Sequence, residues 1–221
     1  MCGRKYASEE LTWAEYREIL NIIPDQPSNL APNYNIAPTH QVLAFRKNTE
    51  EASLSPLHWG LVPHWAKDAK KAGSMINARS ETLEEKPSFR PLLKSRRCAV
   101  LVSGFYEWQR RLGSTGKDKQ AHKIERGDGQ PMLLAGLWTR NDALNLESYT
   151  IVTTAATPDF AALHHRLPTI LEPDQLDLWL TGEWDAARDL LTPYAGALNT
   201  AAISNAVGNV RNNGPELLSP L

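Results

Sequence analysis

The feature that most constrains this fold is a series of short, apolar, β-like runs between residues 41 and 156. Turn sequences such as GSTGKDK and GDGQP separate them, and residues of this kind end strands and form hairpin connections. No run is followed by a glycine-rich dinucleotide or phosphate-binding motif, which argues against a doubly wound nucleotide-binding fold. The predicted strands lie at 41–46, 53–62, 97–109, 121–125, 132–139 and 149–156.

Helix-like segments lie on both sides of this strand-rich middle. Ser8, followed by two acidic residues, predicts a helix over 8–22 that begins with a hydroxyl cap. Prolines spread over 24–38 then require extended chain. This segregation predicts an α+β fold with a mainly antiparallel, β-barrel-like core and flanking helices. The later helices are predicted over 158–165, 173–180 and 183–191.

Length and charge limit the remaining possibilities. The 221 residues contain no internal repeat, so we expect a single domain over 1–221. With 24 basic and 25 acidic residues, the chain lacks the broad basic excess of a dedicated duplex binder, so any DNA site must be a local groove. A polar N-terminus and only two cysteines predict a cytoplasmic protein with no membrane partner. Nothing requires more than a monomer.

The start of the chain, Met1-Cys2-Gly3-Arg4, carries the most chemical information. A small second residue allows removal of Met1, which would give Cys2 a free α-amine. The pKa of that amine is about 8 and the pKa of the thiol is about 8.5, so both are partly reactive close to neutral pH. An amine and a thiol on adjacent carbons convert an aldehyde first to an imine and then to a thiazolidine ring. The alternative that Cys2 stands there by chance remains open on this tetrapeptide alone.

A second enzymatic interpretation also begins at Cys2. Glutamine amidotransferases of the N-terminal-nucleophile class start their mature chains with Cys-Gly. They use the thiol as nucleophile and the α-amine as base. Such an amidohydrolase normally works with a domain that consumes ammonia, for which 221 residues leave no room. Hydrolysis of glutamine would distinguish this alternative from aldehyde capture.

Six further segments, in order, resemble the SRAP (SOS-response-associated peptidase) family, also called abasic-site processing proteins. Together with Met-Cys-Gly-Arg they span nearly the whole chain. The segments are YNIAP (34–38), WGLVPHW (59–65), INARSET (76–82), GFYEW (104–108), LHHRLP (163–168) and AVGNVRNNGPEL (206–217).

The resemblance implies a sensor of abasic sites in single-stranded DNA that acts in the DNA damage and SOS response. After Met1 is removed, Cys2 would form a covalent thiazolidine link to the open abasic sugar and thereby shield the lesion. This is a lyase-like crosslinking activity, and any peptidase activity would be limited to N-terminal processing. We expect nucleoid association when the protein is bound to DNA.

The same resemblance implies four catalytic residues. Cys2 is the nucleophile, and Asn77 in INAR would position its amine through a neutral amide. Glu107 in GFYEW would shuttle protons during imine formation or reversal. The family pattern His-any-Arg assigns His164 as the catalytic histidine, which would help to open the sugar ring, and His165 as its variable neighbour.

The DNA-binding residues follow in the same way. Guanidinium groups suit phosphate geometry, and an exposed tryptophan can stack on an unpaired base. The histidines and cysteines show no metal-ligand spacing, so we predict no metal and no cofactor; Cys98 is expected to be an inert buried thiol. The implied DNA contacts are Arg4, Asn35, Pro38, Trp65, Arg79 and Arg166.

Overall fold

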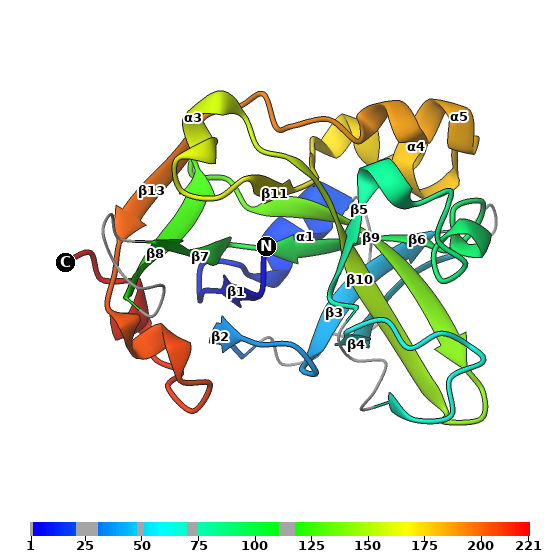
Figure 1. The fold of residues 1–221 in the computed structure, drawn as a ribbon, viewed down its shortest axis with the longest axis horizontal. Coiled ribbons are helices and arrows are strands. Elements are labelled where there is room, and N and C mark those ends of the chain that lie inside the picture. Colours follow the sequence, from blue (N-terminus) through cyan, green and yellow to red (C-terminus); the bar gives the residue numbers. More distant parts are fainter. Residues whose placement is uncertain (1, 21–30, 48–50, 70–74, 111–117) are drawn as a thin grey trace.

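The computed structural model describes residues 2–20, 31–47, 51–69, 75–110 and 118–221. Its strands gather into a barrel and a second sheet, with short helices at the periphery (Figure 1). The predicted α+β class and the mainly antiparallel, barrel-like core are therefore confirmed. No helix in the described ranges is long and apolar enough to cross a membrane.

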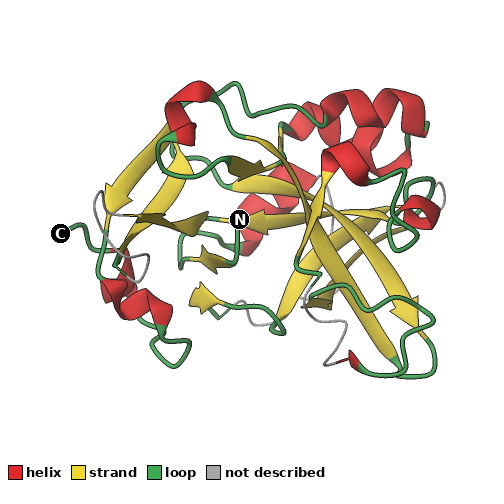
Figure 2. Cartoon of the chain, viewed as in Figure 1, coloured by secondary structure: helices red, strands yellow, loops and turns green. Residues whose placement is uncertain are grey.

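Five of the described strands close into a barrel, which lies beside the second sheet (Figure 2). Each strand pairs with the next, and β9 pairs with β10, which closes the ring. Neighbours run antiparallel except for β10 and β4, which are parallel. Closure leaves the barrel strands without open edges. In ring order the strands are β10 (Leu146–Ala155), β4 (Ala52–Trp59), β3 (Gln41–Lys47), β6 (Arg97–Val102) and β9 (Met132–Asn141).

Short strands extend the barrel at the end of β10. Both β5 (Asn77–Arg79) and β11 (Arg166–Pro168) pair with β10, so that Thr153 is the partner of Arg79 on one side and of Pro168 on the other. Two distant motifs, INAR and HHR, therefore flank the same stretch of β10. A further short strand, β12 (Ile170–Leu171), pairs with β9.

The second sheet is antiparallel throughout and contains the N-terminal strand. The predicted run 97–109 divides at Ser103: its first half is β6 in the barrel and its second half is β7 in this sheet. Gly104 stands at the division because a Cβ there would lie 2.4 Å from the Tyr6 hydroxyl and 2.4 Å from the Ile124 carbonyl oxygen. The strand order is β13 (Leu198–Ala202), β8 (Lys119–Arg126), β7 (Gly104–Arg110), β1 (Arg4–Ala7) and β2 (Asn33–Ile36).

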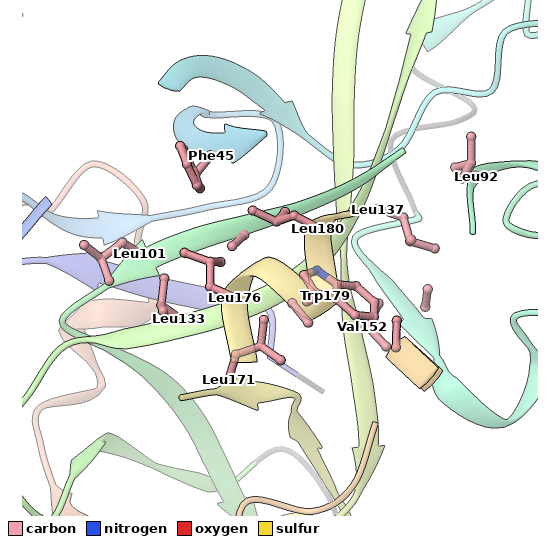
Figure 3. Close-up of a cluster of buried hydrophobic side chains, with 14 of the residues drawn as sticks. Phe45, Leu92, Leu101, Leu133, Leu137, Val152, Leu171, Leu176, Trp179 and Leu180 are labelled. Atoms are coloured by element: carbon pink, nitrogen blue, oxygen red, sulfur yellow. The ribbon is translucent and has the colours of Figure 1, made fainter. Parts of the chain in front are cut away.

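One helix, α4 (Leu176–Thr181), covers the barrel with an apolar face (Figure 3). Its Trp179 is fully buried and donates its indole N–H to the Cys98 carbonyl oxygen at 2.8 Å. Burying a large side chain of this kind contributes about 1.5–3 kcal/mol, so this helix helps to fix the barrel beneath it. The helix α5 (Trp184–Ala187) follows it.

The predicted helices exist, but their bounds differ. The 173–180 segment begins as a 3₁₀ turn, Pro173–Gln175, before α4, and the 183–191 segment ends as a 3₁₀ turn, Arg188–Leu190, after α5. The 158–165 segment is helical only over α3 (Pro158–Ala161), because the chain then turns back and Ala156 N–H bonds the His165 carbonyl.

The prediction of a helix capped by Ser8 was wrong. Ser8 is buried and its N–H donates to the Ser103 hydroxyl at 2.9 Å, whereas α1 begins at Trp13 and runs to Leu20. Thr12 provides the cap: its hydroxyl accepts the Ala14 N–H at 3.1 Å, and the Glu15 carboxylate accepts the Thr12 N–H at 2.9 Å. The end predicted at residue 22 lies outside the described residues.

Candidate functional site

Cys2 lies two residues before the first residue of β1, at the junction of the barrel and the second sheet. Its side chain is 1% exposed and belongs to a buried cluster with Trp59 and Tyr149. The Cys2 carbonyl oxygen accepts a hydrogen bond from the Asn77 side-chain amide at 2.9 Å. The side chain of Asn77, one of the predicted catalytic residues, therefore connects β5 to the N-terminal segment at Cys2. Met1, whose removal we expected, lies outside the described residues.

The Asn77 amide retains an unused acceptor. Its Nδ2 is committed to Cys2, while its Oδ1 is buried and has no hydrogen-bond partner within the described part of the chain. Buried amide oxygens are normally satisfied, so this atom is suited to accept a hydrogen bond from a nearby N–H. An amine on Cys2 would be such a donor.

Glu107 and His164 extend this arrangement from two other segments. Glu107 is on β7 and only 4% exposed, and its charge acts on Cys2 by raising the pKa of the thiol. His164 follows α3, and its Nδ1 lies 3.9 Å from Glu107 Oε1. A chain of neighbours therefore runs from Asn77 through Cys2 and Glu107 to His164. The structure brings together all four residues predicted to be catalytic.

Burial controls protonation in this site. It lowers the pKa of His164, and the Glu107 charge offsets part of this effect. A neutral ring therefore predominates at neutral pH. Its Nδ1 lies 3.0 Å from the Arg166 N–H and 3.1 Å from the Arg166 carbonyl oxygen. The neutral ring can accept from the first, and the protonated ring can donate to the second, so both protonation states find a partner.

The thiol of Cys2 is held in its protonated form. Burial raises its pKa to about 12, and the nearby charge of Lys5 acts in the opposite direction. Cys98 is fully buried, as predicted, and burial raises its pKa to about 12 as well. Either thiol needs a nearby base or positive charge to ionise at neutral pH. Of the two cysteines, Cys2 is the one that contacts a predicted catalytic residue, Asn77.

Lys5 is a site residue that the sequence analysis missed. Its side chain is fully buried, its Nζ donates to the Tyr149 hydroxyl at 2.5 Å, and it lies 3.7 Å from the centre of the Trp59 ring. A lysine between Arg4 and Tyr6 in a short strand gives no warning of burial, because lysine is usually solvated. Only the position of β1 against the barrel reveals it.

Arg4 and Asn35 support a loop rather than lie open to a ligand. The Arg4 guanidinium donates to Asn35 Oδ1 at 2.6 Å and to the Val207 carbonyl at 2.8 Å. Asn35 is 1% exposed, and its amide donates to carbonyls of Val207, Asn209 and Asn212. Together they hold the 207–212 segment beside the N-terminal strand. Their direct contact with DNA stays a prediction.

Arg166 is also engaged within the protein. Its side chain is buried and makes a two-pronged ion pair with Glu81, with the second contact at 2.9 Å, and it donates to the Thr153 carbonyl. This pair ties the segment after Asn77 to the segment after His164. Its contact with a phosphate stays a prediction, and its contacts within the protein are those of a residue that positions its neighbours.

Arg79, Trp65 and Pro38 are more accessible. Arg79 is exposed on β5, two residues from Asn77, and Trp65 is 51% exposed. The His64 ring packs edge-on against Trp65 with 4.7 Å between ring centres, which steadies an otherwise open indole. Pro38 is half-buried and precedes Thr39, whose positive φ of 75° makes a sharp bend before β3. Their contacts with DNA likewise stay predictions.

The described residues contain no group of three or more histidine, cysteine or acidic side chains placed to hold a metal ion. The chemistry available at this site is that of a thiol, an amide, a carboxylate, an imidazole and a buried amine.

Comparison with known proteins gives one consistent result. The family model described as SOS response associated peptidase (SRAP) matches residues 1–210. The abasic site processing protein YoqW of Bacillus subtilis is 36% identical, with 99% of each chain covered. YedK of Escherichia coli, with the same description, is 32% identical over the full length of both chains. HMCES of Gallus gallus is 34% identical over 86% of this chain and 66% of its own.

Solved structures share the fold. A Bacteroides thetaiotaomicron protein superposes with a TM-score of 0.81 at 21% identity, covering 98% of this chain and 99% of its own. A Bordetella bronchiseptica protein superposes with a TM-score of 0.76 at 26% identity, covering 92% of this chain and 100% of its own. The first of these likenesses shows the fold alone.

Proposed function

This chain belongs to the SRAP family, and from that premise we propose that it senses abasic sites in single-stranded DNA and links to them covalently through Cys2. The observation that carries the proposal is the Asn77–Cys2 hydrogen bond of 2.9 Å, with the Glu107 charge acting on the same cysteine and His164 lying 3.9 Å from Glu107. Its relatives' description as abasic site processing proteins supports the choice of substrate.

The chemistry begins when Met1 is removed. The freed Cys2 amine attacks C1′ of the open sugar aldehyde, and the adduct takes up a proton and loses water, which gives a protonated imine. The thiol then loses its proton, its sulfur bonds to C1′, and the C=N electron pair moves to nitrogen. The product is a neutral five-membered thiazolidine. Asn77 would orient the amine by using its free Oδ1 as acceptor.

Glu107 and His164 would supply the proton transfers. Opening the cyclic sugar requires a proton to leave the C1′ hydroxyl and another to reach the ring oxygen. A neutral imidazole suits the first transfer, and burial favours that form of His164. Glu107 Oε1 lies 3.9 Å from His164 Nδ1, so its charge would stabilise the imidazolium that forms when the ring takes up a proton. We propose that the fold acts as a single domain and a monomer in this reaction.

The strand would run past the accessible residues of the site. Arg79 would bind a phosphate, and Trp65 would stack on a base next to the lesion. The engaged residues would act indirectly, Arg4 and Asn35 through the 207–212 segment and Arg166 through Glu81. The near-zero net charge predicts weak binding to intact duplex.

Incubation with an oligonucleotide that carries one abasic site tests the proposal. A band of reduced mobility that survives heat and denaturant is expected for wild type. Cys2→Ser keeps the amine and should give a product only after borohydride trapping of the imine. A protein that shifts a native gel yet leaves no covalent band would be a binding module only. Release of ammonia from glutamine would favour the amidotransferase alternative instead.

A further inference from the structure

The geometry points to Lys5 as the group that accepts the proton of the Cys2 thiol when the thiazolidine ring closes. The inference rests on the proposed function and adds a residue to it. Lys5 is a buried lysine that no other step of that reaction uses, and it belongs to β1, which begins two residues after Cys2.

Lys5 occupies an environment that suits a base. Its side chain is fully buried in β1, and its Nζ is 2.5 Å from the Tyr149 hydroxyl, 3.7 Å from the Trp59 ring centre and 4.8 Å from the Tyr149 ring centre. The two rings favour a cation through their π-faces. Burial nevertheless lowers the pKa of Lys5 to about 7, so the neutral amine is well populated at neutral pH.

Cys2 shares this enclosure. It packs in the buried cluster that contains Trp59 and Tyr149, and the charge of Lys5 lowers the pKa of its thiol, against the larger effect of burial. Conversely, the Cys2 thiolate would raise the pKa of Lys5. A proton that moves from sulfur to nitrogen therefore converts two neutral groups into an ion pair in a site of low polarity, where each charge stabilises the other.

Lys5 is the basic group of this enclosure. The titratable groups that face it are Cys2, Cys98 on β6 and Tyr149 on β10, and Glu107 on β7 faces Cys2. Burial raises the pKa of both thiols to about 12 and that of the Tyr149 phenol well above its usual value. Among the lysine, the two thiols and the phenol, Lys5 alone changes charge near neutral pH.

Ring closure moves one proton from Cys2 to Lys5. The Cys2 S–H bond breaks and its proton joins the lone pair of neutral Lys5 Nζ. The sulfur pair forms the bond to C1′, and the C=N pair of the protonated imine moves to the Cys2 nitrogen. One positive charge leaves the imine and one appears on Lys5, which then returns its proton to water.

The test measures thiol ionisation without DNA. Iodoacetamide alkylates the thiolate, and peptide mass mapping separates Cys2 from Cys98. For the full chain we expect the rate at Cys2 to rise with pH around a midpoint near 7, set by Lys5. In Lys5→Met the midpoint should move up by at least one unit, and the rate at neutral pH should fall about tenfold or more. Identical profiles for wild type and Lys5→Met would overturn the proposal.

Two further variants complete the test. Lys123→Met removes a lysine whose Nζ pairs with Glu125 at 3.1 Å on β8, and its profile should match wild type. Tyr149→Phe removes an acceptor from the Lys5 ammonium, so its midpoint should move down, opposite to Lys5→Met. An unchanged or raised midpoint in Tyr149→Phe would also overturn the role of Lys5, even if Lys5→Met failed to fold.

Crosslinking separates this inference from the function that it extends. If the alkylation profiles shift as expected but neither wild type nor any variant forms a crosslink to abasic DNA, the proposed function fails and the Lys5–Cys2 coupling stands. If wild type links to DNA and Lys5→Met links at the same rate with the same pH profile, the function stands and Lys5 is not the proton acceptor.

Discussion

The ion pair between Glu81 and Arg166 offers the sharpest test of how the site is held. Glu81→Gln removes the charge from a pair that connects the end of β5 with β11. The Arg166 side chain is 8% exposed and would keep its bond to the Thr153 carbonyl, while the Glu81 side chain is 51% exposed. Breaking a buried pair costs about 3–5 kcal/mol, and the exposure of one partner reduces this to about 2 kcal/mol.

Glu84→Gln is the matched control. Glu84 lies three residues further on and pairs with Arg188 at 3.6 Å, with both side chains half-exposed at 57% and 50%. A pair of this kind contributes about 0–1 kcal/mol, and glutamine keeps the oxygen that accepts the Trp184 N–H. We therefore expect the two neighbouring substitutions to differ by more than 1 kcal/mol, about a factor of 5 in the unfolding equilibrium.

Urea unfolding at constant m-value measures both variants. A loss of about 2 kcal/mol should lower the melting temperature of a chain of this size by about 4–8 °C. Glu81→Gln should also slow crosslinking, because the pair ties the segment that carries Asn77 to the segment that carries His164. Equal stability and equal crosslinking rates in Glu81→Gln and Glu84→Gln would refute this account of Arg166.

Three further predictions concern the site itself. His164→Ala should slow crosslinking in a single-turnover assay while His165→Ala, on the exposed neighbour, changes it little; equal losses would contradict the assignment of the catalytic role to His164. Trp65→Ala should weaken binding to single-stranded DNA by about 1–3 kcal/mol in a titration, and a smaller loss there than on duplex would remove its stacking role. An alanine inserted between Met1 and Cys2 should abolish the heat-stable adduct while DNA binding persists, because an amide nitrogen cannot form an imine; a normal adduct from that variant would rule out the α-amine as nucleophile.

Much of the fold follows from local pattern, and the exceptions have physical causes. The barrel strands were predicted because their apolar runs are bounded by turn residues. The division of 97–109 was not, since the close approach of Tyr6 and Ile124 to Gly104 is a tertiary contact. Ser8 was a plausible cap, but its contact with Ser103 decided its role.

The site divides in the same way. The resemblance selected Cys2, Asn77, Glu107 and His164, and these lie together. Residues that act through burial could not be foreseen: Lys5 is charged in sequence and enclosed in space, and Asn35 looked like a loop contact but supports a loop from within. A motif identifies which side chains matter, whereas their environment is formed by segments of the chain that are distant in sequence.

The central claim is that the Cys2 α-amine and thiol both bond to one sugar carbon. Peptide mass mapping of the adduct formed with an abasic oligonucleotide, after heat denaturation and borohydride treatment, tests it most directly. We predict that the DNA remnant resides on the N-terminal peptide that begins at Cys2, with no free thiol on that peptide and no hydrogen gained from borohydride. A remnant on any other residue, or a Cys2 thiol still open to alkylation in the adduct, would contradict the claim.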